Sequence, residues 1–204
     1  MINPKKLIIP AIILGGTLLL LAMYFPGLRP ERPMGRVVEG VAAIGGAFTL
    51  VDQKNNTVTS EALKGKLSLV YFGFTNCPDI CPLTLATMTQ ALNMAGPVAD
   101  DVVPLFITVD PERDTVAVMA EYVANFHPRF LALTGTLDQV RTATSAYRVY
   151  FKKAKVEAPD EYMMDHSGFV YLMDRTGAYM THFKPDVTPE QMAARLRTDL
   201  DPRR

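Results

Sequence analysis

The sequence contains two cysteines, Cys77 and Cys81, which lie four positions apart directly after an apolar segment. That segment, residues 67–74, is rich in aromatic and branched residues and predicts a buried strand. Thiolates are both redox groups and soft metal ligands. We therefore expect the two cysteines to act as a pair at the end of this strand, carrying electrons, a metal ion, or both.

The spacing of the two cysteines allows more than one kind of chemistry. Three residues separate the two cysteines, one more than in the familiar C-x-x-C dithiol. If the segment forms a helical turn, positions four apart share one face, so both sulfurs can face one metal ion and can also close a disulfide. The start of the following helix is expected to favour thiolate over thiol.

The chain has three histidines that could complete a metal site with the cysteines. Structural Zn²⁺ prefers four protein ligands, whereas Cu(I) accepts two thiolates and one imidazole. His127 lies at a helix end beside a proline and His182 lies in a predicted strand, so ordinary structural roles account for both. His166 lies in a polar junction, residues 162–168, directly before a strand, and is the strongest candidate of the three.

The elements that would position these residues alternate between strands and helices. The sequence predicts strands at residues 47–51, 57–59, 67–74, 102–109, 130–133, 148–151, 169–173 and 179–183, and helices at 82–94, 116–126, 137–146 and 189–200. Two helices begin with capping boxes, at Thr136 to Gln139 and Thr188 to Gln191. The pattern predicts an α/β domain with a thioredoxin-like fold, a mixed sheet flanked by helices. In such open sheets ligands bind beyond the carboxyl ends of strands, where Cys77 lies.

The N-terminal part of the chain predicts a membrane anchor. Residues 7–25 carry no charged side chain, and as a helix they would span about 28 Å, enough to cross a bilayer. We predict a short cytoplasmic N-terminus at residues 1–6, a transmembrane anchor at 7–25, a tether at 26–46 and the folded domain at 47–204. A cleavable signal peptide is the alternative, although Ala22-Met-Tyr24 is a poor cleavage site.

The net charge of the chain limits the classes of partner that it is expected to bind. The chain has 21 basic and 21 acidic side chains, so its formal charge is zero and gives no electrostatic reason to expect nucleic acid. Charges on the two sides of the apolar segment are tied and leave its orientation open. Six residues precede that segment, too few for a mitochondrial presequence, which favours a protein of the bacterial inner membrane.

Several segments carry a resemblance to the Sco/SenC family of copper-binding proteins. They are residues 71–82, 109–115, 128–135, 146–150 and 165–174, and the match runs in order from about Phe48 to Leu200. The resemblance implies a thioredoxin-like fold and a membrane anchor that holds the domain in the periplasm or the mitochondrial intermembrane space, with the domain facing outward. It also implies that Cys77, Cys81 and His166 bind copper for the assembly of the copper A centre of cytochrome c oxidase, whose subunit II would be the partner.

Under this interpretation the reduced cysteines and neutral His166 hold one copper ion, as Cu(I), Cu(II) or both, and pass it to the oxidase. A Cys77–Cys81 disulfide would abolish the site, so a thiol reductant and a periplasmic copper donor are further expected partners. The alternative is a thiol–disulfide oxidoreductase that reduces partner cysteines with the same redox-active pair. That alternative would make the protein an enzyme rather than a metallochaperone.

Four neighbouring side chains have weaker claims to the site. Asp79 and Asp165 flank the proposed ligands and could orient the histidine or add an oxygen donor. Met163 and Met164 carry soft thioethers that could hold copper transiently. Turn, cap and packing roles are the simpler interpretations, and we leave all four out of the predicted site.

Overall fold

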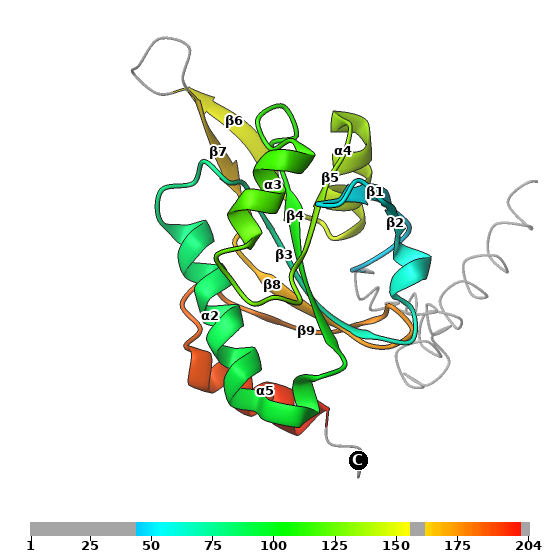
Figure 1. Ribbon diagram of the computed structural model, residues 1–204, viewed down its shortest axis with the longest axis vertical. Coiled ribbons are helices and arrows are strands. Elements are labelled where there is room, and N and C mark those ends of the chain that lie inside the picture. Colours follow the sequence, from blue (N-terminus) through cyan, green and yellow to red (C-terminus); the bar gives the residue numbers. More distant parts are fainter. Residues whose placement is uncertain (1–43, 156–161, 201–204) are drawn as a thin grey trace, which may run out of the picture. The chain divides into compact units, whose positions relative to one another are not determined.

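The computed structural model describes residues 44–155 and 162–200, which contain helices, a large sheet and a separate hairpin (Figure 1). The strands of the large sheet are β1 (Thr49–Asp52), β2 (Thr57–Thr59), β3 (Leu67–Gly73), β4 (Val102–Thr108), β5 (Leu131–Thr134), β8 (Val170–Met173) and β9 (Tyr179–Phe183). Their order across the sheet is β2-β1-β5-β4-β3-β8-β9.

The sheet is mixed, as the sequence predicts. β3, β4 and β5 are parallel, whereas β1 pairs antiparallel with β5, and β8 pairs antiparallel with β3. All seven residues of β3 are buried, because this central strand has β4 on one side and β8 on the other. A strand paired on both edges and covered on both faces needs a continuous apolar sequence, which residues 67–74 supply.

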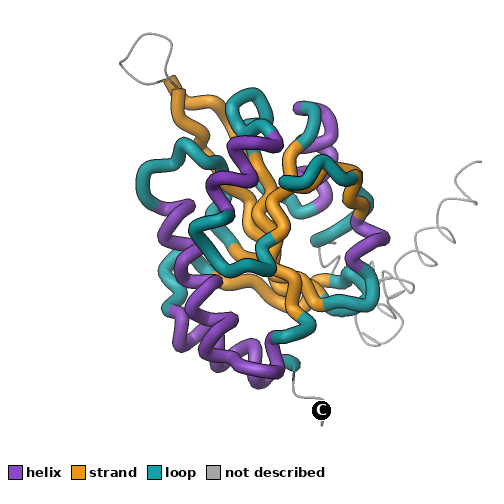
Figure 2. The backbone as a smooth tube through the Cα atoms, in the orientation of Figure 1, coloured by secondary structure: helices purple, strands orange, loops and turns teal. Residues whose placement is uncertain are grey.

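Among residues 44–155 and 162–200, four α-helices pack around the sheet, and Figure 2 shows them with the central strands. They are α2 (Ile80–Ala95), α3 (Val116–Val123), α4 (Leu137–Ala146) and α5 (Pro189–Asp199). Short 3-10 helices occupy Ser60–Leu63 and Gly96–Ala99. Both predicted capping boxes are present at the starts of α4 and α5, and Thr115 caps α3. α2 packs along α5, and the Cys81 sulfur on α2 lies against Tyr71 and Gly73 of β3.

A two-stranded hairpin forms a second, separate sheet. Its strands are β6 (Phe151–Lys155) and β7 (Tyr162–His166), which pair antiparallel with Phe151 opposite His166. The expected strand at residues 148–151 is wrong except for its last residue, since Arg148 takes a positive φ of 54° that ends α4 before β6 begins. The expected polar junction at 162–168 is instead mostly strand. Its residues pair only with β6, whose three lysines gave no sign of a strand partner.

The predicted anchor at 7–25 and most of the predicted tether lie outside the described residues, as does the short N-terminus. Within residues 44–155 and 162–200, no helix combines the length and the apolar character that a membrane crossing needs.

Candidate metal site

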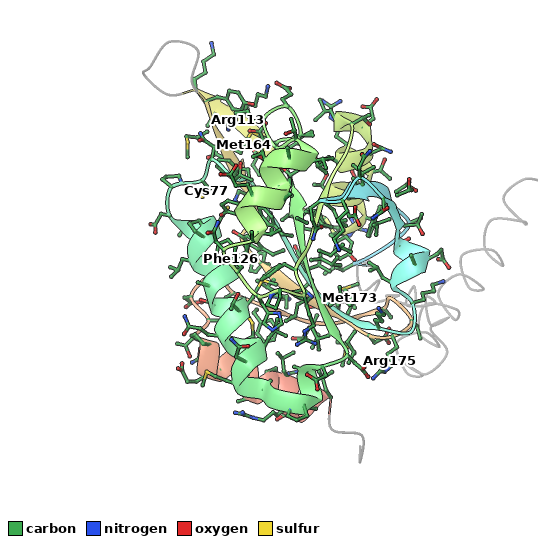
Figure 3. All side chains as sticks on the ribbon, viewed as in Figure 1. Cys77, Arg113, Phe126, Met164, Met173 and Arg175 are labelled. Atoms are coloured by element: carbon green, nitrogen blue, oxygen red, sulfur yellow. The ribbon has the colours of Figure 1, made fainter. Side chains whose placement is uncertain are left out.

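Cys77 and Cys81 lie where β3 gives way to α2, the position that the sequence predicts. Figure 3 labels Cys77. Cys77 is in the loop and partly exposed, whereas Cys81 is in the first turn of α2 and fully buried. Both thiols are free, and the backbone N–H of Cys81 donates to Cys77 Sγ at 3.4 Å. The helical turn therefore brings one sulfur next to the backbone of the other cysteine, as expected for positions four apart.

The buried sulfur of Cys81 packs against β3. A Cβ atom at Gly73 would lie 2.8 Å from Cys81 Sγ and 2.9 Å from a ring carbon of Phe106, closer than carbon and sulfur atoms approach. The hydroxyl of Tyr71, on the same strand, donates to Cys81 Sγ at 3.5 Å. Gly73 and Tyr71 are site residues that the sequence reasoning missed. The one signal was a glycine at the end of an otherwise bulky apolar strand.

His166 is the last residue of β7, and its side chain meets Cys81. Nε2 lies 3.6 Å from Cys81 Sγ, although the two residues are 85 positions apart in sequence. Nδ1 lies 3.1 Å from the carbonyl oxygen of Ser167. Because a carbonyl only accepts, Nδ1 carries the proton in this contact, and neutral His166 keeps the lone pair on Nε2 directed at the sulfur. The rings of Tyr71 and Phe74 pack edge-on against the imidazole.

Burial sets the protonation of both groups. It raises the pKa of the Cys81 thiol to about 12, and hydrogen bonds from Tyr71 and the backbone at Phe74 offset this only in part. The expectation that the helix start would favour thiolate is therefore wrong for Cys81, because loss of water outweighs the helix N-terminus. Burial also lowers the pKa of His166. A neutral imidazole next to a protonated thiol is a pair that a soft cation can bind by displacing the thiol proton.

The donor set fits copper better than zinc. Two sulfurs and one imidazole nitrogen are what Cu(I) accepts, while a closed zinc site requires a fourth protein ligand. In the described part of the chain, no three His, Cys, Asp or Glu side chains already stand together as a complete metal site. Cys81 and His166 are in contact, so completing the set requires Cys77 to turn its sulfur from the backbone of Cys81 toward them.

The other two histidines are engaged elsewhere. The backbone N–H of Arg129 donates to His127 Nδ1 at 3.2 Å, and burial together with Arg129 lowers the pKa of His127. His182 lies 2.5 Å from the hydroxyl of Tyr179 and packs edge-on against Phe169. Neither contact involves a cysteine, which agrees with the structural roles expected for both.

Of the four flanking side chains, Met164 has the packing role expected of it, whereas Asp79 does not cap the helix that it precedes. Asp79 is the exposed residue that precedes α2 and makes no side-chain cap hydrogen bond. Asp165 is exposed on β7, and its charge counters the lowering of the pKa of His166. Met164 is 7% exposed and packs in the core, while Met163 faces Ala154 across the hairpin.

The loop between β4 and α3, residues 110–115, fastens the cysteine segment. Asp114 is fully buried, and its carboxylate accepts from the Thr75 N–H at 3.1 Å, the Thr75 hydroxyl at 2.5 Å and the Thr108 hydroxyl at 2.6 Å. Thr75 precedes Cys77 by two residues, so this carboxylate fixes the backbone that leads into the cysteine pair. Buried carboxylates are found where such donors satisfy them.

The same loop fastens the histidine hairpin. Arg113 Nε pairs with Asp110 Oδ2 at 2.5 Å, and Arg113 Nη1 donates to the carbonyl oxygen of Tyr162 at 3.0 Å. The guanidinium lies 3.8 Å from the centroid of the Tyr162 ring, whose hydroxyl donates to Asp110 Oδ1 at 2.8 Å. Figure 3 shows Arg113 and Met164 together beside the hairpin, at the end of the domain where Cys77 lies. Tyr162 starts β7, the strand that ends at His166.

Known proteins resemble this chain over most of its length. The family model described as SCO1/SenC matches residues 37–201. The chain belongs to the SCO1/SenC family. Among its SCO1/SenC relatives, a SCO2-like protein of Rickettsia conorii is 43% identical over 176 residues, which cover 83% of this chain and 85% of the relative.

Two solved Sco structures show how the family fold compares. ScoI of Bradyrhizobium japonicum, solved with copper bound, is 44% identical with a TM-score of 0.70, covering 76% of this chain and 99% of that one. BsSco, a member of the Sco family of cytochrome c oxidase assembly proteins in which a disulfide switch was identified, is 25% identical with a TM-score of 0.60. That match covers 78% of this chain and 95% of BsSco. The predicted resemblance and the thioredoxin-like mixed sheet are thereby confirmed.

Proposed function

We propose that this protein is a copper metallochaperone that binds one copper ion through Cys77, Cys81 and His166 and helps to assemble the copper A centre of cytochrome c oxidase. The observation that carries the proposal is the 3.6 Å contact between Cys81 Sγ and His166 Nε2, made across 85 residues beside a second free cysteine. Copper bound to ScoI of Bradyrhizobium japonicum supports the choice of metal. Membership of BsSco in a family of oxidase assembly proteins supports the choice of partner.

The proposal includes a place in the cell. Residues 7–25 would anchor the protein in the bacterial inner membrane, residues 26–46 would tether the domain, and residues 47–204 would work in the periplasm. There the protein would receive copper from a periplasmic donor, depend on a thiol reductant, and deliver copper to subunit II of the oxidase. Because copper is the cargo, the site must release it as well as bind it, and a set of two thiolates and one imidazole leaves an open side for a competing ligand.

Copper titration of the full-length chain tests the ligand set. With the thiols reduced, we expect one copper ion per wild-type chain. His166→Ala should lower the affinity by more than about a hundredfold, because residues that only orient metal ligands already cost about 10- to 100-fold. Cys77→Ser and Cys81→Ser should weaken binding at least as much.

His182→Ala is the matched control, since it removes an imidazole whose contacts are with Tyr179 and Phe169. We expect it to bind copper as the wild type does. Equal affinities for His166→Ala and His182→Ala would rule out the three-ligand site.

A second function has its own support. Cys77 is partly exposed and Cys81 is buried four residues later, so an accessible thiol could attack a partner disulfide and the buried thiol could then resolve the mixed disulfide. The disulfide switch of BsSco is consistent with such chemistry. A thiol–disulfide oxidoreductase would reduce a disulfide substrate over many turnovers without copper, whereas a metallochaperone would transfer copper once per chain. A turnover assay in the presence of a copper chelator separates the two.

A further inference from the structure

Tyr71 is a buried tyrosine in the middle of the large sheet. It lies on β3 with no exposed surface, and it pairs with Phe106 on β4 and with Val170 on β8. A tyrosine hydroxyl in such a position requires a hydrogen-bond partner, because burying an unpaired hydroxyl is costly. The partner here is the sulfur of Cys81, at 3.5 Å.

The ring of Tyr71 has little freedom to turn away from that sulfur. It stacks on Phe106, with centroids 6.2 Å apart and an angle of 18° between the planes. It also packs edge-on against His166, with centroids 6.1 Å apart. Tyr71 therefore touches both groups that make the Cys81–His166 contact, and its hydroxyl is a fixed donor rather than a mobile one.

We propose that Tyr71 is a positioning residue of the metal site, whose hydroxyl holds the Cys81 sulfur toward His166 Nε2 and withdraws electron density from it. The proposal rests on the proposed function for its copper-dependent part. When copper displaces the Cys81 proton, the hydrogen bond from Tyr71 stabilises the resulting thiolate and lowers the energy of its donor electrons. The same bond is present in the metal-free reduced structure, where both thiols are free. Closing a disulfide would draw the Cys81 sulfur to about 2.05 Å from the Cys77 sulfur, so the bond to Tyr71 favours the reduced, metal-binding pair.

Tyr71→Phe tests the proposal by removing the hydroxyl and keeping the ring. We expect the affinity for Cu(I) to fall about tenfold, as for loss of one hydrogen bond to a charged group. The sulfur-to-copper absorption band of the Cu(II) form should move to longer wavelength. Without copper, the midpoint potential of the Cys77–Cys81 disulfide, which takes up two electrons and two protons from a glutathione buffer, should become more negative.

Tyr122→Phe is the matched control. The Tyr122 ring also packs on Phe106, at 5.4 Å, but its buried hydroxyl has no hydrogen-bond partner among the described residues. Removing that hydroxyl breaks no bond, so we expect affinity, absorption band and potential to stay at their wild-type values.

Replacement of Tyr71 by 3-fluorotyrosine provides a second variant that keeps a hydroxyl of greater donor strength. It should shift the band and the potential in the directions opposite to Tyr71→Phe, a reversal that a merely structural role would not produce. All measurements use the full-length chain. Unchanged potentials in both Tyr71 variants would overturn the proposal. Failure of the wild type to bind copper would overturn the proposed function, while the metal-free potentials would still decide the role of Tyr71.

Discussion

The two sides of the proposed metal site are built differently. The cysteine side is part of the core, because Cys81 on α2 is fully buried and its sulfur lies against β3. The histidine side belongs to a hairpin, β6 and β7, that shares no strand pairing with the large sheet. That hairpin is fastened by Arg113, Asp110 and Tyr162 through hydrogen bonds and an ion pair. Close packing around Cys81 is supplemented on the first side by the hydrogen bonds of Asp114 to Thr75, whereas on the second side polar contacts are supplemented by the packing of Met164.

This difference predicts how substitutions on each side change the stability of the protein. Packed cores resist any change of volume, because neighbouring atoms already lie at van der Waals distance. Polar contacts near the surface are individually weaker and can exchange with water. We therefore expect substitutions on the cysteine side to be costly and local, and substitutions on the histidine side to loosen the hairpin while the core stays folded.

Gly73→Ala should have the largest effect. Its methyl group would lie 2.8 Å from Cys81 Sγ and 3.0 Å from a ring carbon of Tyr71, so we expect the free energy of unfolding to fall by about 2–3 kcal/mol, as in overpacked cores. Copper affinity should fall as well, because the sulfur must move. Urea denaturation and copper titration of the full-length chain measure both effects.

Gly168→Ala applies the same change to the histidine side. The added methyl group would lie 3.2 Å from the Cγ atom of Pro185, and Gly168 is partly exposed. We expect a loss within about 0.5 kcal/mol, typical of surface positions. Equal losses at Gly73 and Gly168 would contradict the contrast between a packed side and a tethered side.

Arg113→Met should have an intermediate effect that is confined to the hairpin. It leaves the buried carboxylate of Asp110 without its cation and the carbonyl of Tyr162 without a donor. Because Arg113 is 28% exposed, water can replace part of the interaction, and we expect a loss of about 1–2 kcal/mol. Hydrogen exchange should quicken at residues 162–166 and remain slow along α2.

Lys153→Met is the control for Arg113→Met, because it removes a different cation, one that lies on β6 of the hairpin itself. Lys153 pairs with Glu112 at 2.6 Å, but both side chains are about half exposed, at 46% and 55%. Such pairs contribute about 0–1 kcal/mol. Lys153 Nζ also lies 4.4 Å from the centroid of the Tyr162 ring. If Lys153→Met accelerated exchange in β7 as much as Arg113→Met does, any cation beside Tyr162, rather than the hydrogen bond and ion pair of Arg113, would hold the hairpin.

The smallest effect is expected in the pH dependence at Asp114. Burial raises the pKa of this carboxyl above its ordinary value of 3.8, against the hydrogen bonds from Thr108 and Thr75. The folded state then binds the proton more tightly than the unfolded chain does. Asp114 thus contributes stability that is complete below pH 3.8 and is lost as pH rises through the raised pKa.

Urea denaturation across this pH range, wild type against Asp114→Asn, measures the contribution. The stability of the wild type relative to the variant should decline as pH rises and then level off. Parallel curves for the two proteins would show that the pKa of Asp114 does not change on folding.

Much of this architecture was accessible from the sequence. Continuous apolar strands such as β3 and capping boxes such as Thr136 to Gln139 are local signals, and both were predicted correctly. The pairing of Cys81 with His166 came from the family resemblance and a polar junction, since no local pattern records a contact across 85 residues. The hairpin was missed because Phe151–Lys155 has lysines where an apolar face would be expected, and it pairs only with β7.

The protonation state of Cys81 and the packing around it could not be predicted from the sequence. The helix start next to Cys81 was visible in the sequence, but its raised pKa comes from burial of the sulfur against β3, beside Tyr71 and Gly73. Strand register decides which side chains lie together in the core, and register cannot be read from the sequence alone. The same holds for Arg113, whose partner Tyr162 lies 49 residues away on the hairpin.

The loop at residues 110–115 supplies none of the three proposed donors, yet it contacts both sides of the site, through Asp114 to Thr75 and through Arg113 to Tyr162. The separation between the cysteine pair and His166 is thus governed by a short segment that can vary without loss of any donor atom. Under the proposed function, substitutions in this loop alone would change how tightly copper is held while every donor residue stays the same.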